Sequence, residues 1–297
     1  MTVESVIGGT MSAVQITVIV PFWRDPRLRL CIEALSAQTL DPSEFEVILV
    51  NNDPEDTTDY NPLPPNMRVI TEAKPGSYAA RNAGLREAKG DIIAFTDADC
   101  IPDADWLEQG LRAFSNPAAD LISGPIEVFR EKRGTWLAWK YDETTAFQQR
   151  CLASSGTAVT ANVLVRGCVF DTVGAFDESQ MSGGDREFTL RATRAGCRLF
   201  YDAKVRVSHP ARERIADVIE RKRRIFGART LRARNDGRLG RFCAQIVLPP
   251  FRQLRANLFE QRSATGIFLS FWIGWYLKLH MIAEVARVLS GAESRRR

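Results

Sequence analysis

The stretch GSYAARNAGLREAKGDIIAFTDAD (residues 76–99) decides the fold. It reads as a helix that stops near Gly90, followed at once by a β-strand that ends in two aspartates. Two earlier stretches, QITVIVP (15–21) and FEVILVNND (45–53), also read as strands with polar ends, and LRLCIEALSAQ between them has helical spacing of apolar residues. Strands that alternate with helices of about a dozen residues predict βαβ units and a parallel sheet, with ligand sites beyond the strands' carboxyl ends.

The next part of the chain predicts the second half of the same domain. We expect a short strand over 67–70, a helix over 134–149 and an apolar stretch over 157–165. A helix at FTLRATRAG (188–196) and one strand at RLFYDAKVRVSH (198–209) follow. These elements predict a single α/β domain with a mixed sheet over residues 14–210.

Composition and cysteine use narrow the class of protein. The 297 residues are 45% hydrophobic and 26% charged, which is typical of a globular protein and excludes collagen-like and mainly disordered chains. Six cysteines without a CxxC pair indicate neither a zinc site nor a disulfide framework and favour a reducing cytosol. Residues 1–13 lack the features of a secretory signal and are predicted to be a short leader.

The charge of the chain is divided unevenly. Residues up to Ala203 hold 19 Lys/Arg against 29 Asp/Glu, and the remainder holds 21 against 7. Residues 211–297 are predicted to be a helical extension, with a basic run over 221–241 and an aromatic, apolar stretch over 264–289. The uncharged part of that stretch, Ser263 to Leu277, is 15 residues long and therefore short of a membrane span.

Three interpretations of this extension remain open. It is a solvated basic helix with a second helix packed on the domain, an attachment to an anionic membrane surface, or a nucleic-acid patch. The membrane interpretation is preferred. Nucleic acid is disfavoured because the aromatic residues are separated from the basic run rather than interleaved with it.

Asp97 and Asp99 carry the clearest chemical signal. A D-x-D sequence at a strand end directs both carboxylates to one side, which suits a divalent cation such as Mg²⁺ or Mn²⁺ with substrate phosphates completing its coordination. The alternative is a solvated acidic turn. A loop and helix N-terminus with a nearby arginine, just before this strand, favour an anionic phosphate and support the metal interpretation.

Four motifs in this order resemble the family 2 glycosyltransferases. They are ITVIVPFWRD with CIEALSAQTL, FEVILVNND, the 76–99 stretch, and VGAFDESQMSGGDREFTLRATRAG (173–196). The resemblance runs from about Gln15 to His209. It implies a GT-A fold, a Rossmann-like nucleotide-diphospho-sugar transferase, in which residues 14–125 bind the sugar nucleotide and residues 126–210 bind the acceptor. It also implies an inverting enzyme that depends on Mg²⁺ or Mn²⁺.

The resemblance assigns roles to residues of the first half. It implies that Pro21 and Phe22 border the nucleotide, that Asn52 faces the base, that Arg81 approaches the diphosphate, and that Asp97 and Asp99 manage sugar and metal. Asn51 and Asn52 stand where the family commonly has two aspartates, so an acceptor-only carboxylate is replaced by an amide that also donates. The base preference of the site is therefore left open.

The second half would supply the base and a further ligand. Asp185 is the candidate base that takes the proton from the incoming hydroxyl, and its alternative role is a helix N-cap. Gly184 stands where the family often has an additional acid, and Glu187 either acts in the site or only balances the helix N-terminus. His209 matches a histidine that in this family reaches the metal or the diphosphate.

We therefore predict a glycosyltransferase that moves a sugar from a nucleotide-sugar donor to a saccharide or lipid-linked acceptor, in surface polysaccharide or glycolipid synthesis. It would be cytoplasmic and peripheral on the inner face of the cell membrane, at an anionic membrane surface. Two alternatives are a nucleotidyltransferase, for which the glycine-free PFWRDPRLRL is unfavourable, and a non-enzymatic basic protein that binds nucleic acid. The second alternative does not account for the acidic front of the chain.

Overall fold

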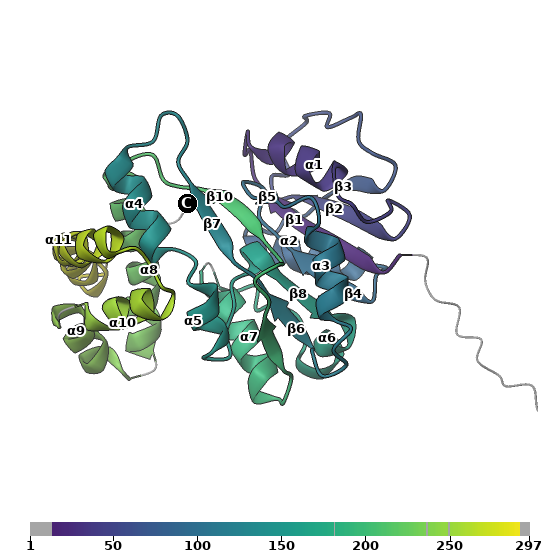
Figure 1. Ribbon diagram of the computed structural model, residues 1–297. Helices are drawn as coiled ribbons and strands as arrows, with labels where there is room; N and C mark the ends of the chain where they lie inside the picture. The colour runs from purple at the N-terminus through teal and green to yellow at the C-terminus, as the bar shows by residue number, and fades with distance from the viewer. Residues whose placement is uncertain (1–13, 181, 236, 249, 292–297) are drawn as a thin grey trace, which may run out of the picture.

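A mixed seven-stranded sheet forms the centre of the computed structural model, which describes residues 14–291 except 181, 236 and 249 (Figure 1). The strand order is β3-β2-β1-β4-β8-β6-β9. The strands are β1 (Ile16–Phe22), β2 (Phe45–Asn51), β3 (Met67–Thr71), β4 (Ile92–Phe95), β6 (Leu121–Ser123), β8 (Val163–Arg166) and β9 (Leu199–Tyr201). The first four are mutually parallel, whereas β8 is antiparallel to both of its neighbours. The predicted mixed α/β fold is confirmed, and the leader predicted for residues 1–13 lies outside the described residues.

Helices cover both faces of this sheet because its central strands are apolar on both sides. Val18 and Val20 of β1 face the core that contains α1 (Leu28–Ser36) and α3 (Trp106–Ala113). Ile19 faces the opposite core. That second core contains side chains of α2 (Ser77–Glu87), α6 (Gly167–Val173) and α7 (Gly184–Arg194). The helix and strand predicted for residues 76–99 are confirmed as α2 and β4.

The single strand predicted over 198–209 is wrong. The segment forms β9 in the large sheet and then β10 (Val207–Pro210) in a second sheet, between β5 (Ile101–Pro102) and β7 (Ile126–Phe129). The break follows from a local turn, in which the Asp202 carboxylate accepts a hydrogen bond from the backbone N–H of Lys204 at 2.8 Å. An alternating apolar pattern does not reveal that its two ends pair with different sheets.

The helix predicted over 134–149 is also divided. It forms α4 (Trp136–Thr145) and α5 (Gln149–Ala153), and Phe147 between them adopts a left-handed φ of 47°. The apolar stretch at 157–165 becomes a short 3₁₀ turn, η1 (Thr160–Asn162), that leads into β8.

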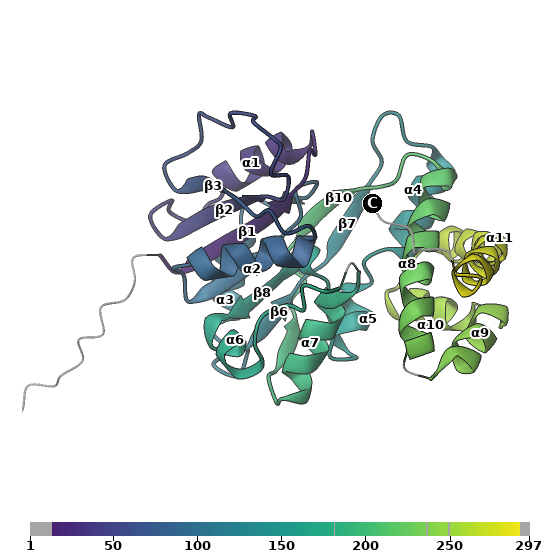
Figure 2. The same ribbon diagram turned by 180° about the vertical axis from the view of Figure 1, so that it is seen from behind.

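The C-terminal region forms a helical layer beside the sheets (Figures 1 and 2). It contains α8 (Ile215–Asn235), α9 (Leu239–Val247), α10 (Phe251–Phe259) and α11 (Ala264–Leu289). Tyr141 of α4 packs with Val218, Ile246 and Leu277 of this layer. The predicted boundaries at 125 and 210 stay predictions. Across the second of them, α4 packs with these later helices.

We expect that Asn162→Leu lowers the free energy of unfolding by about 3 kcal/mol in urea titrations. The fully buried Asn162 side chain accepts from the indole N–H of Trp106 at 3.0 Å. It also donates to the carbonyls of Pro125 and Val205, at 3.0 and 2.8 Å. Leucine leaves the indole N–H of Trp106 and the carbonyl of Val205 buried without a partner, whereas the Pro125 carbonyl still accepts from the N–H of Val207. A loss below about 1 kcal/mol would contradict this role of Asn162.

Candidate active site

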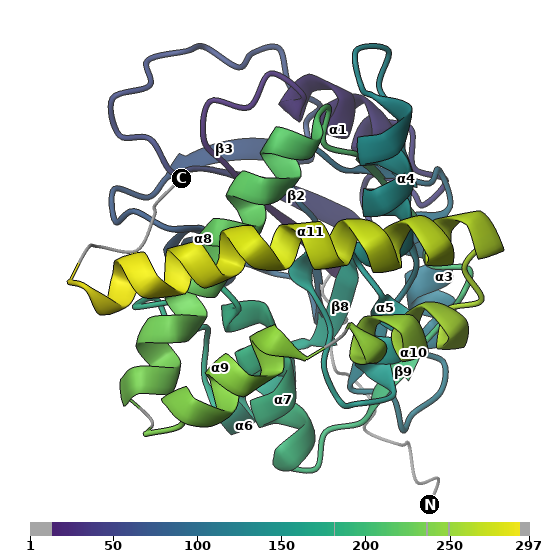
Figure 3. The same cartoon turned by 90° about the vertical axis from the view of Figure 1, so that its left-hand side faces the viewer.

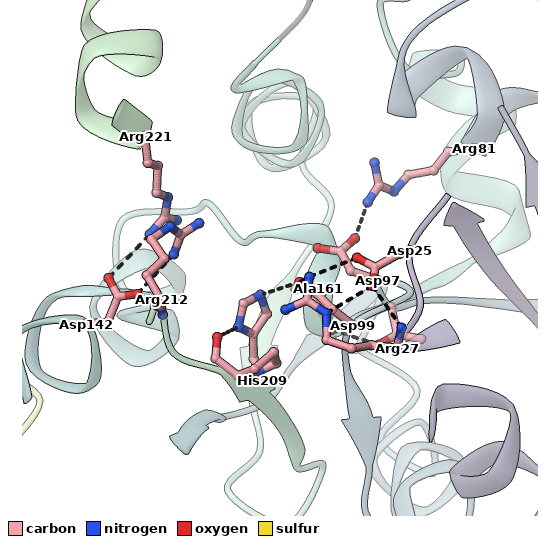
Figure 4. A network of polar contacts seen from close by, with 12 residues as sticks. Asp25, Arg27, Arg81, Asp97, Asp99, Asp142, Ala161, His209, Arg212 and Arg221 are labelled. Atoms are coloured by element: carbon pink, nitrogen blue, oxygen red, sulfur yellow. Dashed lines mark hydrogen bonds and ion pairs between the residues drawn. The ribbon is translucent and has the colours of Figure 1, made fainter. Parts of the chain in front are cut away.

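The candidate site lies where the carboxyl ends of β1, β2 and β4 meet the second sheet (Figure 4). Asp97 and Asp99 follow β4 directly, and β10 of the smaller sheet brings His209 to the same place. The hydroxyl of Thr96, just before Asp97, donates to the carbonyl of Ala161. This bond fixes the end of β4 to the 3₁₀ turn that precedes β8. The two sheets therefore supply side chains to one polar cluster.

Asp99 is the centre of a compact polar group. One of its carboxylate oxygens lies 3.5 Å from His209 Nε2 and 3.4 Å from a guanidinium nitrogen of Arg27. The Arg27 guanidinium also forms two hydrogen bonds with Asp25, each of 2.9 Å. Sequence reasoning placed Asp25, the last residue of the motif ITVIVPFWRD, at this edge of the sheet without giving it a role. It missed Arg27, which lies two residues further on.

The protonation of His209 follows from its backbone contact. Its Nδ1 lies 2.6 Å from the carbonyl oxygen of Pro210, which can only accept, so Nδ1 carries the proton. Burial lowers the pKa of His209, and the charge of Asp99 opposes this shift. A neutral imidazole with the Nε2 lone pair toward Asp99 has the form in which histidine binds a metal.

The donor atoms here suit a hard or borderline divalent cation. Oxygen, nitrogen and sulfur atoms of Asp99, His209 and Cys100 lie within 4.8 Å of one another. Burial raises the pKa of Cys100, so its sulfur stays a thiol and is a poor ligand. The effective set is one carboxylate and one neutral imidazole, and phosphate oxygens would complete it for Mn²⁺ or Mg²⁺. Cys100 was missed, although it adjoins the D-x-D sequence.

Arg81 and Asp97 form the other half of this edge. Arg81 is a buried residue of α2, and its guanidinium lies 2.5 Å from an oxygen of Asp97. Its Nε is buried and has no hydrogen-bond partner among the described residues. Sequence reasoning placed both residues at this edge, and the structure brings them together. A role for either in binding the diphosphate stays a prediction.

Asp185 lies on α7, close to this pair. The alternative role as an N-cap is wrong, because the cap position is Gly183 with φ 81° and Asp185 already lies inside the first turn. One Asp185 oxygen accepts from the backbone N–H of Arg186 at 2.8 Å and lies 3.4 Å from the hydroxyl of Tyr78. Tyr78, which sequence reasoning missed, also accepts from the backbone N–H of Gly184.

Burial raises the pKa of the Asp185 carboxyl. The hydrogen bond from Arg186 and the charge of Arg81 oppose this shift, whereas the charge of Asp97 adds to it. A carboxylate with a raised pKa is a stronger base than an exposed aspartate. Glu187, in contrast, is paired with Arg191 at 2.9 Å along α7, which favours the structural role for Glu187.

The remaining candidates lie at the carboxyl ends of β1 and β2. Pro21 and Phe22 are the last residues of β1 and are buried. The Asn52 amide donates to the carbonyls of Glu72 and Lys74, and its oxygen accepts from the N–H of Gly76. The amide nitrogen and the amide oxygen of Asn52 therefore both bond to the loop before α2 and fix it. Contact of Asn52 with a base stays a prediction. A cavity of about 350 Å³ lies nearby, with Asn51 among its lining residues.

The family model described as Glycosyl transferase family 2 matches residues 17–170. The chain belongs to this family. Glycosyltransferase AglE of Haloferax volcanii is 36% identical over 205 residues, which are 66% of this chain and 67% of that protein. The uncharacterized glycosyltransferase YwdF of Bacillus subtilis is 32% identical over 184 residues, 60% of this chain and 67% of YwdF.

Solved structures agree with this glycosyltransferase fold. Residues 1–349 of S. aureus TarS, in complex with UDP, match with a TM-score of 0.53 and 17% identity, over 95% of this chain and 93% of the other. As a member of the family 2 glycosyltransferases, the protein transfers a sugar from a nucleotide-sugar donor in glycan synthesis. The nucleotidyltransferase and nucleic-acid-binding alternatives are set aside.

We expect that Asp185→Asn removes sugar transfer while leaving the protein at least as stable as the wild type at pH 7. The folded protein holds the pKa of Asp185 above that of the unfolded chain, so the charged carboxylate costs stability once the pH exceeds the folded pKa. Below the ordinary aspartate pKa of about 4 the stability difference should vanish. Urea unfolding at several pH values, with turnover on the same samples, measures both effects.

The same shift predicts the acid limb of the rate profile. The wild-type rate should fall on acidification at a pH above about 4, because the base must be ionised. Retained turnover in Asp185→Asn would exclude Asp185 as the base. A matched Glu187→Gln variant, which removes a charge two positions away on the same helix, should retain turnover.

Proposed function

We propose that this protein is an inverting, divalent-metal-dependent transferase that moves a sugar from a nucleotide-sugar donor to a saccharide or lipid-linked acceptor. The product would belong to a surface polysaccharide or glycolipid. The observation that carries the metal dependence is the 3.5 Å approach of Asp99 to the neutral Nε2 of His209. This pair offers two ligands of the kinds that Mn²⁺ or Mg²⁺ accepts, at the edge of the sheet where diphosphates bind.

Asp99 and His209 would hold the cation, and the cation supplies charge neutralisation for the nucleoside diphosphate that leaves. Arg81 contributes a buried guanidinium beside Asp97 and would approach the diphosphate. Pro21 and Phe22 would border the nucleotide, and Asn52 would act by holding the loop of residues 72–76 under the base.

Asp185 would accept the proton of the attacking hydroxyl. Its position next to Tyr78 and its raised pKa support this role. The hydroxyl oxygen attacks the sugar carbon from the side opposite the leaving diphosphate, so the bond to the diphosphate breaks with inversion. The same carboxylate in its protonated form would be a weak base, and this gives the reaction its dependence on pH.

We expect that Asp99→Asn weakens Mn²⁺-dependent binding of UDP by about ten- to a hundredfold, because one charged ligand is lost. Isothermal titration of the full chain, with Mn²⁺ and then with EDTA, measures this. His209→Gln should give a loss of the same kind, since its lone pair is the second ligand. Equal UDP affinity with Mn²⁺ and with EDTA in the wild type would exclude metal dependence.

The membrane location rests on α11, which lies across the outer side of the helical layer (Figure 3). Its inner face packs Leu277, Met281 and Val285 into the core of that layer. Its outer face is exposed by 64% at Phe268, 59% at Trp272 and 66% at Leu279. An apolar surface of this kind, on one side of a helix, is typical of an interfacial helix or another docking site.

In the described part of the chain, α11 is long and apolar enough to cross a membrane by length and composition. Two observations favour an interfacial position over a span. Lys278 within α11 is buried and donates to the carbonyls of Ile246 and Leu248, which ties α11 to α9. Exposed arginines of the neighbouring helices, Arg241, Arg252 and Arg255, supply positive charge for an anionic bilayer.

We expect that the triple substitution Phe268→Ser, Trp272→Ser and Leu279→Ser reduces binding to phosphatidylglycerol-containing vesicles by at least about a hundredfold. The three side chains are exposed, so the melting temperature should change little. Raised salt should release the wild type only in part, because screening weakens the arginine attraction but not apolar insertion. Leu30→Ser, an exposed leucine of α1, is the control. A wild type that does not sediment with these vesicles would contradict the membrane location.

A further inference from the structure

A group of cations lies on the other side of His209 from Asp97 and Asp99 (Figure 4). Arg212, which follows β10, and Arg221 of α8 flank a single buried carboxylate, that of Asp142 on α4. One Asp142 oxygen accepts from the backbone N–H and the guanidinium of Arg212, at 3.1 and 3.0 Å. Arg221 lies 3.9 Å from the other oxygen. Asp142 therefore neutralises only one of the two guanidiniums.

Lys222 adds a third cation to this group. Its ammonium lies 5.9 Å from the centre of the Tyr141 ring. It forms neither a hydrogen bond nor an ion pair with the residues that the structure describes. Burial, together with the charge of Arg221, lowers the pKa of Lys222 to about 8. The group therefore holds excess positive charge in a partly desolvated place, where an anion would be stabilised.

Phe147 connects this group to the candidate metal site. Its ring centre lies 4.5 Å from that of His209, and the Arg221 guanidinium lies 5.5 Å from the same ring. Phe147 has a left-handed φ of 47°, a conformation that costs an aromatic residue energy and is typical of functional sites. The Phe147 ring thus lies between His209 of the candidate metal site and Arg221 of the cationic group.

We propose that Arg212, Arg221 and Lys222 bind a phosphate group carried by the acceptor. Two guanidiniums and one ammonium close to one another match the oxygens of a phosphate ester, which a neutral saccharide does not offer. The inference rests on the proposed function, because it places the nucleotide-sugar donor at Asp99, His209 and Arg81. The acceptor then enters from the side of α8, which packs beneath α11, and presents its hydroxyl toward Asp185.

The first test measures binding of phosphate esters to the full chain in EDTA without nucleotide, so that no cation joins the ester to Asp99. The probes are farnesyl phosphate and glycerol 3-phosphate. We expect Arg221→Gln and Lys222→Gln to weaken binding of the ester by about tenfold or more, because a charge-assisted hydrogen bond is lost. Arg221→Lys should lose less, since it keeps the charge, and it serves as the second variant if Arg221→Gln does not fold.

The two probes separate the sources of the phosphate. Binding of both, weakened alike in the variants, indicates recognition of the phosphate itself, and binding of farnesyl phosphate alone indicates a lipid headgroup. Arg112→Gln removes an exposed arginine of α3 and should change neither affinity. Wild-type protein that binds neither probe, or variants that melt normally and bind as the wild type does, would overturn the proposal.

The second test separates this proposal from the assignment of the donor site. Arg221→Gln should keep the wild-type affinity for UDP with Mn²⁺, whereas Asp99→Asn should lose it. If Arg221→Gln weakens UDP as much as it weakens the ester, the cationic group belongs to the donor diphosphate and the acceptor proposal is wrong. If Asp99→Asn binds UDP normally while Arg221→Gln loses only the ester, the metal assignment fails and the cationic group stands.

Discussion

The approach of Asp99 to His209 depends on a change of sheet within a few residues. Asp99 follows the central strand β4, whereas His209 comes from β10 of the smaller sheet. The two meet because β5, which follows Asp99, pairs with β10. The chain reaches β10 after it leaves the large sheet at β9 and turns at Asp202. The fully buried Asn162 holds this arrangement by bonding to the carbonyls of Pro125 and Val205, which precede β7 and β10.

The sequence predicts that Arg81, Asp97 and Asp99 lie together, and the structure confirms this for a physical reason. Arg81, Asp97 and Asp99 lie on one helix and one strand that are adjacent in sequence, so their juxtaposition follows from local periodicity and the geometry of a parallel sheet. The position of Asp185 inside α7, rather than at its cap, depends on Gly183 adopting a left-handed conformation. The broken strand and the pairing of Asp142 with Arg212 are tertiary, and no spacing in the sequence encodes them.

Charges of opposite sign lie on the two sides of His209. Asp97 and Asp99 make one side acidic, and the buried Arg81 offsets part of that charge. The cationic group around Asp142 makes the other side basic, and His209 lies between them as a neutral imidazole. A site divided in this way would orient an extended, charged substrate before any chemistry, because reversing the substrate would place like charges together.

The helical layer joins this polarity to the outer surface. A core of Tyr141, Val218 and Leu277 packs α4 and α8 against α11. α8, which carries Arg221, is therefore fixed on one side by α11, whose other side exposes Trp272. Lys278 satisfies its charge inside the layer, at the carbonyls of Ile246 and Leu248. The outer face of α11 therefore stays apolar, while the basic side of the cleft lies directly behind it. An acceptor with a lipid tail and a charged head would meet these two surfaces in that order.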